Sequence, residues 1–154
     1  MYKNNFMFTG LLHLHSLLRW IILILLLVSI YQAFNKSKGL QKVSLLLLIS
    51  AHITLLLGLY QWIFSKTVGL KVLIENMGGM GNVMKNPFSR FWVVEHFAGM
   101  LIAIVLITIA RGKAKKDNYD AAKWLYLIAF FLILASVPWP FREVGAGRTW
   151  FPGM

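Results

Sequence analysis

The sequence predicts an all-α integral membrane protein, a four-helix bundle that crosses the bilayer four times. Of its 154 residues, 58% are hydrophobic and only 14% are charged, and the mean hydropathy is +0.68. Soluble domains of this length are far less apolar, and long apolar runs are the sequence signature of membrane-spanning helices. The length allows one compact bundle, so we expect a single transmembrane domain over residues 1–154.

Four apolar segments account for the expected spans. Each of the first three has the ~20 residues that cross a bilayer as a helix. The fourth is shorter, because Pro138 and Pro140 end it sharply. The first segment is too long for a cleaved signal peptide, and its main positive cluster follows it. We expect spans at about residues 11–34, 43–64, 91–110 and 124–138.

The distribution of positive charge predicts the orientation. The connection after the first span and the one after the third are short and dense in Lys and Arg, which is typical of cytoplasmic loops. The opposite side carries seven Lys and Arg spread over longer segments. We therefore expect a multi-pass protein of the inner (plasma) membrane, with both termini and the 65–90 loop extracytoplasmic. These loops and anionic lipid explain the net charge of +11, so the bilayer is the expected partner and nucleic acid is not.

All four histidines fall within the expected spans: His13 and His15 in the first, His52 in the second and His96 in the third. An imidazole in hydrocarbon is costly without a partner, so an intramembrane histidine indicates a functional site. The chain has no cysteine, which excludes iron–sulfur clusters and thiolate metal sites. The pattern predicts a metal centre, and first of all a haem that histidines hold between helices.

Depth in the bilayer distinguishes among these histidines, because a helix rises about 1.5 Å per residue. His15 and His96 both lie roughly 7–9 Å in from the outer boundary, whereas His52 lies roughly 18 Å in. Two axial haem ligands need nearly equal depth on different helices. His15 and His96 are therefore the preferred pair. His13 with His96 also meets the depth condition, and His52 is the alternative to either preferred ligand.

The residues around the first-span histidines favour His15 over His13. The two are about 200° apart around a helix, so they cannot both face the interior. His15 shares its face with Arg19, the one cation deep within a span. Arg19 needs an anion or a dipole, for which Glu95, a haem propionate and a quinone carbonyl are the candidates.

The C-terminal segment VPWPFREVGAGRTWFPGM combines aromatic rings with two cations, Arg142 and Arg148. Its composition favours an aromatic anchor at the outer membrane interface. The functional interpretation is that these arginines pair with haem propionates through charge-assisted hydrogen bonds.

Two other interpretations remain open. Met77, Met80 and Met84 are spaced like a thioether cluster for Cu(I), which with the histidines would make a copper-handling membrane protein. Alternatively, the chain is a cofactor-free scaffold or assembly subunit whose histidines only bond across helices, at about 1 kcal/mol or less each. No motif for hydrolytic catalysis is present, and the sequence leaves open whether the protein is an enzyme.

Several strings carry a resemblance: LHLHSLLRW on the first span, SAHITLLLGLYQW on the second, RFWVVEHFAGMLIAIVLITIAR on the third, and the closing GRTWFPGM. They resemble small four-helix, cytochrome b-like membrane proteins of the Bacteroidota type. More distantly, the chain is similar to the copper-resistance D and cytochrome b-type superfamily. The resemblance implies a b-type haem with bis-histidine ligation by residues among His13, His15, His52 and His96. It further implies electron transfer between a quinone and a respiratory partner subunit. The chain lacks the two matched histidine pairs of larger two-haem cytochromes.

Overall fold

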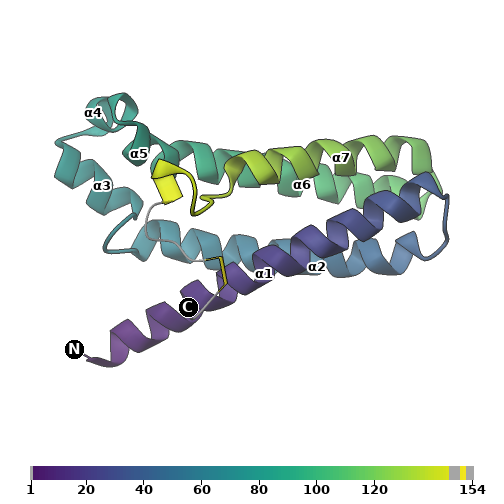
Figure 1. Cartoon of the computed structure of the whole chain (residues 1–154), viewed down its shortest axis with the longest axis horizontal. Coiled ribbons are helices and arrows are strands. Elements are labelled where there is room, and N and C mark those ends of the chain that lie inside the picture. The colour runs from purple at the N-terminus through teal and green to yellow at the C-terminus, as the bar shows by residue number, and fades with distance from the viewer. Residues whose placement is uncertain (1, 146–149, 152–154) are drawn as a thin grey trace. The chain divides into compact units, whose positions relative to one another are not determined.

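The fold is all-α, with four long apolar helices packed as a bundle (Figure 1). The computed structural model describes the backbone of residues 2–145 and 150–151, and side chains from Met7 onward. The described elements are α1 (Tyr2–Phe34), α2 (Leu40–Phe64), α3 (Leu70–Met77), α4 (Met80–Lys85), α5 (Pro87–Arg90), the π-helical turn η1 (Phe91–Glu95), α6 (His96–Lys115), α7 (Tyr119–Ser136) and the 3-10 turn η2 (Glu143–Gly145).

Four helical stretches are long and apolar enough to cross a membrane, which confirms the expected multi-pass class. All four histidines lie within them. Their mean hydropathies are 2.2, 2.1, 2.2 and 1.4 in chain order, so the last one is the least apolar, as its shorter apolar run suggested. The stretches are Met7–Phe34, Leu40–Phe64, Pro87–Lys115 and Tyr119–Ser136.

The helix bounds differ from the expected spans: α1 begins at Tyr2 instead of about residue 11, α2 begins at Leu40 instead of about residue 43, and the third and fourth spans differ as well. The third helical stretch begins at Pro87, because the Asn86 side chain caps it by accepting a 2.8 Å hydrogen bond from the Ser89 amide, and Pro87 suits the first helical position. The fourth helix begins earlier than expected, at Tyr119, and ends at Ser136. The 65–90 segment, expected as a loop, contains α3, α4 and α5. Gly78, with φ +70°, ends α3 in the left-handed conformation.

The chain forms two compact units, and each contains parts of all four long helices. The first unit is Met1–Leu17, Leu56–Ala98 and Ser136–Met154. The second unit is Leu18–Leu55 and Gly99–Ala135. The division cuts across the helices because each unit gathers one end of every span together with the connections at that end.

Small residues recur along the buried face of α6 in the second unit. Along α6, the buried positions Gly99, Ala103, Ile107, Ala110 and Ala114 recur every three or four residues, which places them on one helix face. In membranes, such residues let helices approach closely. The two connections of this unit are tied together as well, because the Gln41 amide donates a 3.4 Å hydrogen bond to Asp117, and Lys36 lies 4.0 Å from Asp120.

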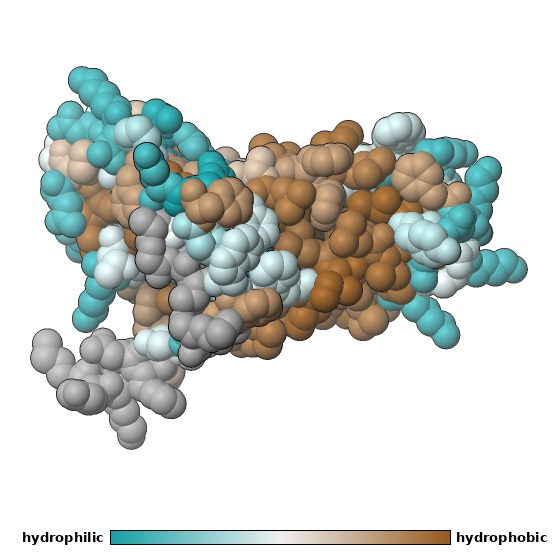
Figure 2. Space-filling view, viewed as in Figure 1, coloured by the Kyte–Doolittle hydropathy of each residue, from teal (hydrophilic) through white to brown (hydrophobic). Residues whose placement is uncertain are grey.

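Large apolar side chains cover the outside of the long helices. In the second unit, Phe131 is 64% exposed, Ile24 59% and Leu46 56%. Figure 2 shows the corresponding hydrophobic surface over the helices and hydrophilic residues at the loop end of this unit. Exposing so continuous an apolar surface to water is unfavourable, whereas the same surface is compatible with the hydrocarbon of a bilayer.

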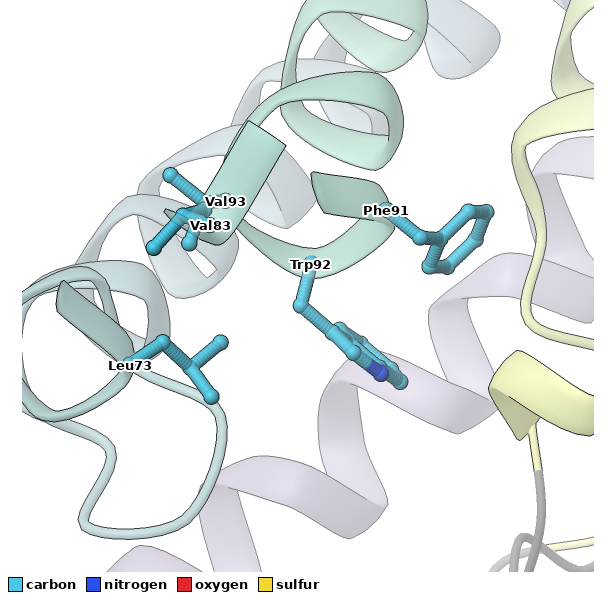
Figure 3. Close-up of a cluster of buried hydrophobic side chains, with 5 residues drawn as sticks. All are labelled: Leu73, Val83, Phe91, Trp92 and Val93. Atoms are coloured by element: carbon cyan, nitrogen blue, oxygen red, sulfur yellow. The ribbon is translucent and has the colours of Figure 1, made fainter. Parts of the chain in front are cut away.

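A separate hydrophobic cluster occupies the first unit. Its buried members are Leu73 on α3, Val83 on α4, and Phe91, Trp92 and Val93 on η1 (Figure 3). The short helices of the 65–90 segment therefore pack onto the π-helical turn that directly precedes His96. This packing positions the start of α6 within the first unit.

Candidate functional site

His96 is held by a backbone carbonyl from another helix. Its Nδ1 lies 2.7 Å from the carbonyl oxygen of Ser136, the last residue of α7. A carbonyl only accepts hydrogen bonds, so Nδ1 carries the proton and the lone pair of the ring is on Nε2. Histidines that bind metals in proteins are commonly oriented this way, with one ring nitrogen donating to a carbonyl or carboxylate.

The amino-acid sequence explains why the Ser136 carbonyl takes this role. In a continuing helix it would accept from the amide of residue 140, but residue 140 is proline and has no N–H. A helix end without such a donor needs another partner for its carbonyl, and inside a bilayer water cannot supply it. The imidazole of His96 therefore satisfies the end of α7 and is itself fixed in direction.

Aromatic rings surround the His96 imidazole. The ring centroids of Phe91 and Trp92 lie 5.9 and 5.7 Å from it, and both residues belong to the π-helical turn η1. The Trp92 indole donates a 3.1 Å hydrogen bond to the Val144 carbonyl, which ties η1 to the C-terminal segment. A π-helical turn inside a longer helix occurs frequently at functional sites, and here it ends at the histidine.

His15 packs against a glycine of α2. A Cβ added to Gly58 would lie 3.2 Å from Cε1 of the His15 ring, so the missing side chain is what makes room for the imidazole. Four residues before His15, the Leu11 carbonyl accepts a 3.2 Å hydrogen bond from the Gln61 amide. These two contacts fix the register between α1 and α2 at the level of His15.

The same face of α2 receives the start of α6. Trp62 lies one helical turn after Gly58, so the two share a face. Its indole stacks on Phe97, with centroids 4.7 Å apart and planes 15° apart, and donates a 3.0 Å hydrogen bond to the Val93 carbonyl. His15 and the residue that follows His96 thus contact α2 about one turn, or roughly 5–6 Å, apart along its axis. The first unit therefore contains both His15 and His96, each on a segment that contacts α2.

The other two histidines are placed differently. His13 is half-buried in the first unit, two residues before His15 on α1. His52 belongs to the second unit, where its side chain is exposed and its Nδ1 lies 2.8 Å from the carbonyl of Leu48 on its own helix. This local bond satisfies one ring nitrogen of His52 without using another helix.

The candidate cations also fall in different units. The guanidinium of Arg142 lies 5.1 Å above the Phe91 ring, and its Nη1 donates a 3.2 Å hydrogen bond to the Val137 carbonyl. Because Phe91 borders His96, Arg142 belongs to the same neighbourhood. Arg19 is in the second unit, where its guanidinium lies 5.2 Å from the centre of the Trp20 ring. Arg148 lies outside the described residues.

Glu95, one of the candidate partners for Arg19, forms an ion pair with Arg90. Its carboxylate accepts a 2.6 Å charge-assisted hydrogen bond from Nε of Arg90, one helical turn earlier in the chain. Both side chains are more than a third exposed. The sequence expectation missed this pair because Arg90 was placed at the end of a loop, whereas it belongs to the same continuous helical stretch.

The methionines of the 65–90 segment do not share one environment. Met77 packs against the hydrophobic cluster of the first unit, whereas Met80 and Met84 are 45% and 44% exposed. Within the described part of the chain, no three His, Asp or Glu side chains converge in a way that would hold a metal ion by themselves. A metal at this site would therefore depend on few protein ligands.

Three features of the site were not anticipated from the sequence: the Ser136 carbonyl, the Trp62 indole and the π-helical turn. Pro140 could have predicted the role of the Ser136 carbonyl, because a proline has no N–H and therefore leaves the carbonyl four residues earlier without its usual helical donor. Nothing local to Trp62 or to residues 91–95 indicates their roles, because both depend on contacts between segments far apart in the chain.

Comparison with known proteins identifies no family, since no family model, no curated protein and no solved structure matches the chain.

Proposed function

We propose that the protein is a one-electron carrier of the membrane that holds one b-type haem between helices of the first unit. His96 and His15 are the axial ligands in this proposal, with His52 the alternative to either and His13 the neighbour that faces away. A bound haem would supply reversible one-electron chemistry at its iron, tuned by its ligands and by burial.

The observation that supports this proposal most is the hydrogen bond from His96 to the Ser136 carbonyl. It sets the tautomer that leaves Nε2 with a lone pair, which is the form of histidine that binds iron or copper. It also restrains the ring from α7, so a ligand bond would need little further ordering of His96.

The donor set of the first unit fits such a group. Two imidazoles on separate helices, with no thiolate in the chain, match bis-histidine ligation of a b-type haem. The imidazole of His15 already occupies the space that Gly58 leaves on α2, so it is held by packing instead of by solvent. Phe91 and Trp92 would exclude water on the His96 side.

Charge near His96 has the sign that haem propionates require. Arg142 is the described cation of this neighbourhood, and its contact with Phe91 holds it beside the histidine. Arg19 and Arg148 complete the set of cations that we assign to propionates. The resemblance to small cytochrome b-like membrane proteins points to the same cofactor, with a quinone or a respiratory subunit as the partner.

Absorption spectroscopy tests this proposal directly. The full chain is purified in detergent from haem-replete cells, and a reduced-minus-oxidised visible spectrum is recorded together with a metal analysis. We expect a Soret band and about one iron per chain. A colourless, metal-free preparation would overturn the proposal. Retained copper without a Soret band would instead identify a copper-handling protein.

Histidine variants then assign the ligands. Replacing His96 or His15 with alanine should remove most of the Soret absorbance per chain, because each supplies an axial bond that no neighbour replaces. The matched variant His52→Ala changes the same residue type in the second unit and should retain it. If His52→Ala loses haem and His15→Ala retains it, the second axial ligand is His52 and not His15.

The contacts of His15 with Gly58 and of His96 with Ser136 also support a second function, that of a cofactor-free membrane scaffold or assembly subunit. His15 against Gly58 and His96 on Ser136 each join two helices without any cofactor, which is what a membrane scaffold or assembly subunit would need. In that case the wild-type protein is colourless, and His96→Ala lowers stability by about 1 kcal/mol with no loss of metal. Thermal unfolding of the same variants decides between the two functions.

We also propose that both termini are extracytoplasmic in the inner (plasma) membrane, from the density of Lys and Arg in the two short connections. Fusion of a periplasm-active reporter enzyme to the C-terminus should give high activity, and fusion within residues 113–118 should give little. The reverse pattern would invert the orientation.

A further inference from the structure

The second unit contains a layer of polar side chains near the two short connections, and all four long helices contribute to it. We call it the polar layer. Ser29, Ser44 and Tyr126 have no exposed surface. The members are Ser29 and Gln32 on α1, Ser44 on α2, Arg111 on α6 and Tyr126 on α7.

These residues lie at a common level of the unit. Each is a few residues from the end of its helix that faces the connections, from Gln32 just before Phe34 to Tyr126 two turns after Tyr119. At about 1.5 Å per residue, they lie roughly 3–10 Å from those ends. Because Ser29, Ser44 and Tyr126 are also fully buried, they face the interior of the unit at this level.

Some members lie close to one another. The Ser44 side chain and the Arg111 guanidinium are both near the Tyr126 hydroxyl, but neither comes within hydrogen-bond distance of it. The Gln32 amide lies 3.2 Å from where a Cβ on Gly39 would be, at the entry to α2. Ser29 is three residues before Gln32 and therefore shares its face of α1.

Four polar atoms of this layer are buried and have no hydrogen-bond partner among the described residues: Oγ of Ser29, Oε1 of Gln32, Nη1 of Arg111 and Oη of Tyr126. The ion pairs found in the described residues do not include Arg111 either. Proteins satisfy the great majority of their buried polar atoms, with ordered water where no protein group is available. Four such atoms at one level of a single unit therefore require an occupant.

We propose that the polar layer is a binding site for internal water molecules that bridge these four atoms. The mixture of donors and acceptors selects water as the occupant. Arg111 can only donate and Oε1 of Gln32 can only accept, whereas hydroxyl groups do both. Water does both as well. A small anion would accept from Arg111 and Tyr126 but would leave the Gln32 oxygen facing negative charge.

The site has a consequence for the second unit. Water held at Tyr126 keeps the charge of Arg111 solvated inside a span, which removes the need for an acidic partner. The end of the unit near the connections is then polar inside and apolar outside, and the hydration reaches roughly 10 Å along α7 from its first residue.

Hydroxyl-radical labelling of the full-length protein in detergent tests for this water. Radicals formed from bound water oxidise a side chain even when bulk solvent does not reach it. We expect Tyr126 to be oxidised several-fold faster than Phe91, a ring of the hydrophobic cluster that is also almost fully buried. Equal, slow oxidation of the two rings would overturn the proposal.

A stability measurement distinguishes a hydrated layer from a dry one. If the Tyr126 hydroxyl bonds to water, Tyr126→Phe should lower the unfolding midpoint by about 2–5 °C. If the hydroxyl is unsatisfied, the same change should leave the midpoint unchanged or raise it, which would overturn the proposal. Thr54→Val is the matched control, because the Thr54 hydroxyl bonds to the Ser50 carbonyl of its own helix.

Added salt tests the competing occupant. With water in the site, chloride and phosphate should shift the midpoints of the wild type and of Arg111→Gln equally. An anion-dependent rise in the wild type that Arg111→Gln abolishes would show that an anion fills the layer, and would overturn the assignment of water.

Discussion

The two units satisfy their intramembrane polar groups by different means. In the first unit, His96 donates to a carbonyl that a proline left without its usual partner, and Trp62 donates to the carbonyl of Val93. In the second unit, the Tyr126 hydroxyl and Nη1 of Arg111 are just as buried but have no protein acceptor or donor among the described residues. The first unit thus orients these polar groups with protein atoms, whereas for those of the second unit we propose water as the partner.

The two units also differ in the kind of side chains that pack in their interiors. Rings such as Trp62 and Phe97 stack in the first unit, whereas in the second unit alanines such as Ala103 and Ala129 are buried among leucine and isoleucine side chains. Large rings with one polar atom fix a specific geometry, while small residues allow close approach with little directional constraint. A redox centre needs its ligands held in place, so the first unit is the better candidate for the functional site.

Removing Trp62 should have the largest effect on stability. Trp62→Ala loses the stack on Phe97 and the hydrogen bond to the Val93 carbonyl, and leaves a cavity. We expect the free energy of unfolding to fall by about 3–5 kcal/mol. Trp124→Ala, in which the ring is 59% exposed, should cost less than about 1 kcal/mol. Similar losses for the two variants, measured by denaturant titration in micelles, would show that the stack does not hold the first unit together.

Enlarging a small interior residue of the second unit should have an intermediate effect on the free energy of unfolding. Ala129 has no exposed surface, so Ala129→Leu adds three carbon atoms where helices pack closely. Overpacking of this kind typically costs about 1–3 kcal/mol. Val105→Leu enlarges a side chain that is 49% exposed and serves as the control, with little expected change. Unfolding midpoints that coincide for the two variants would contradict a close-packed interior.

A pair of glycine variants should give the smallest difference. Alanine is favoured over glycine in a helix by about 1 kcal/mol, so Gly10→Ala, with open space around the added methyl, should gain most of that amount. Gly58→Ala should gain little, because its methyl would stand 3.2 Å from the His15 ring. If both variants gain equally in thermal unfolding, His15 does not occupy the space beside Gly58.

Much of the fold was accessible from the sequence. Apolar runs of sufficient length predicted four spans, and the structure has four helical stretches of that kind. The ends were less accurate, because the third stretch starts at Pro87 through an Asn86 cap that lies outside the apolar run. The short helices of the 65–90 segment were missed, since they are stabilised by packing on residues 91–93 and not by their own length.

The candidate site was accessible only in part. Composition and position drew attention to the histidines, and the pairing of His15 with His96, based on their equal depth, stays a prediction. The ion pair of Glu95 with Arg90 was not predicted, although Glu95 was one of the three candidate partners for Arg19. Sequence spacing gives the depth of a residue along its helix but not the rotation of that helix against its neighbours.

The sequence by itself determined the class of the protein: hydropathy sets which segments enter a bilayer, and prolines and caps set where helices stop. The tertiary structure decided which polar atoms meet, as with His96 and Ser136, or Trp62 and Val93. The physical reason is that transfer to hydrocarbon depends on each segment alone, whereas a hydrogen bond between helices requires a rotation and register that only the packing of all of them sets.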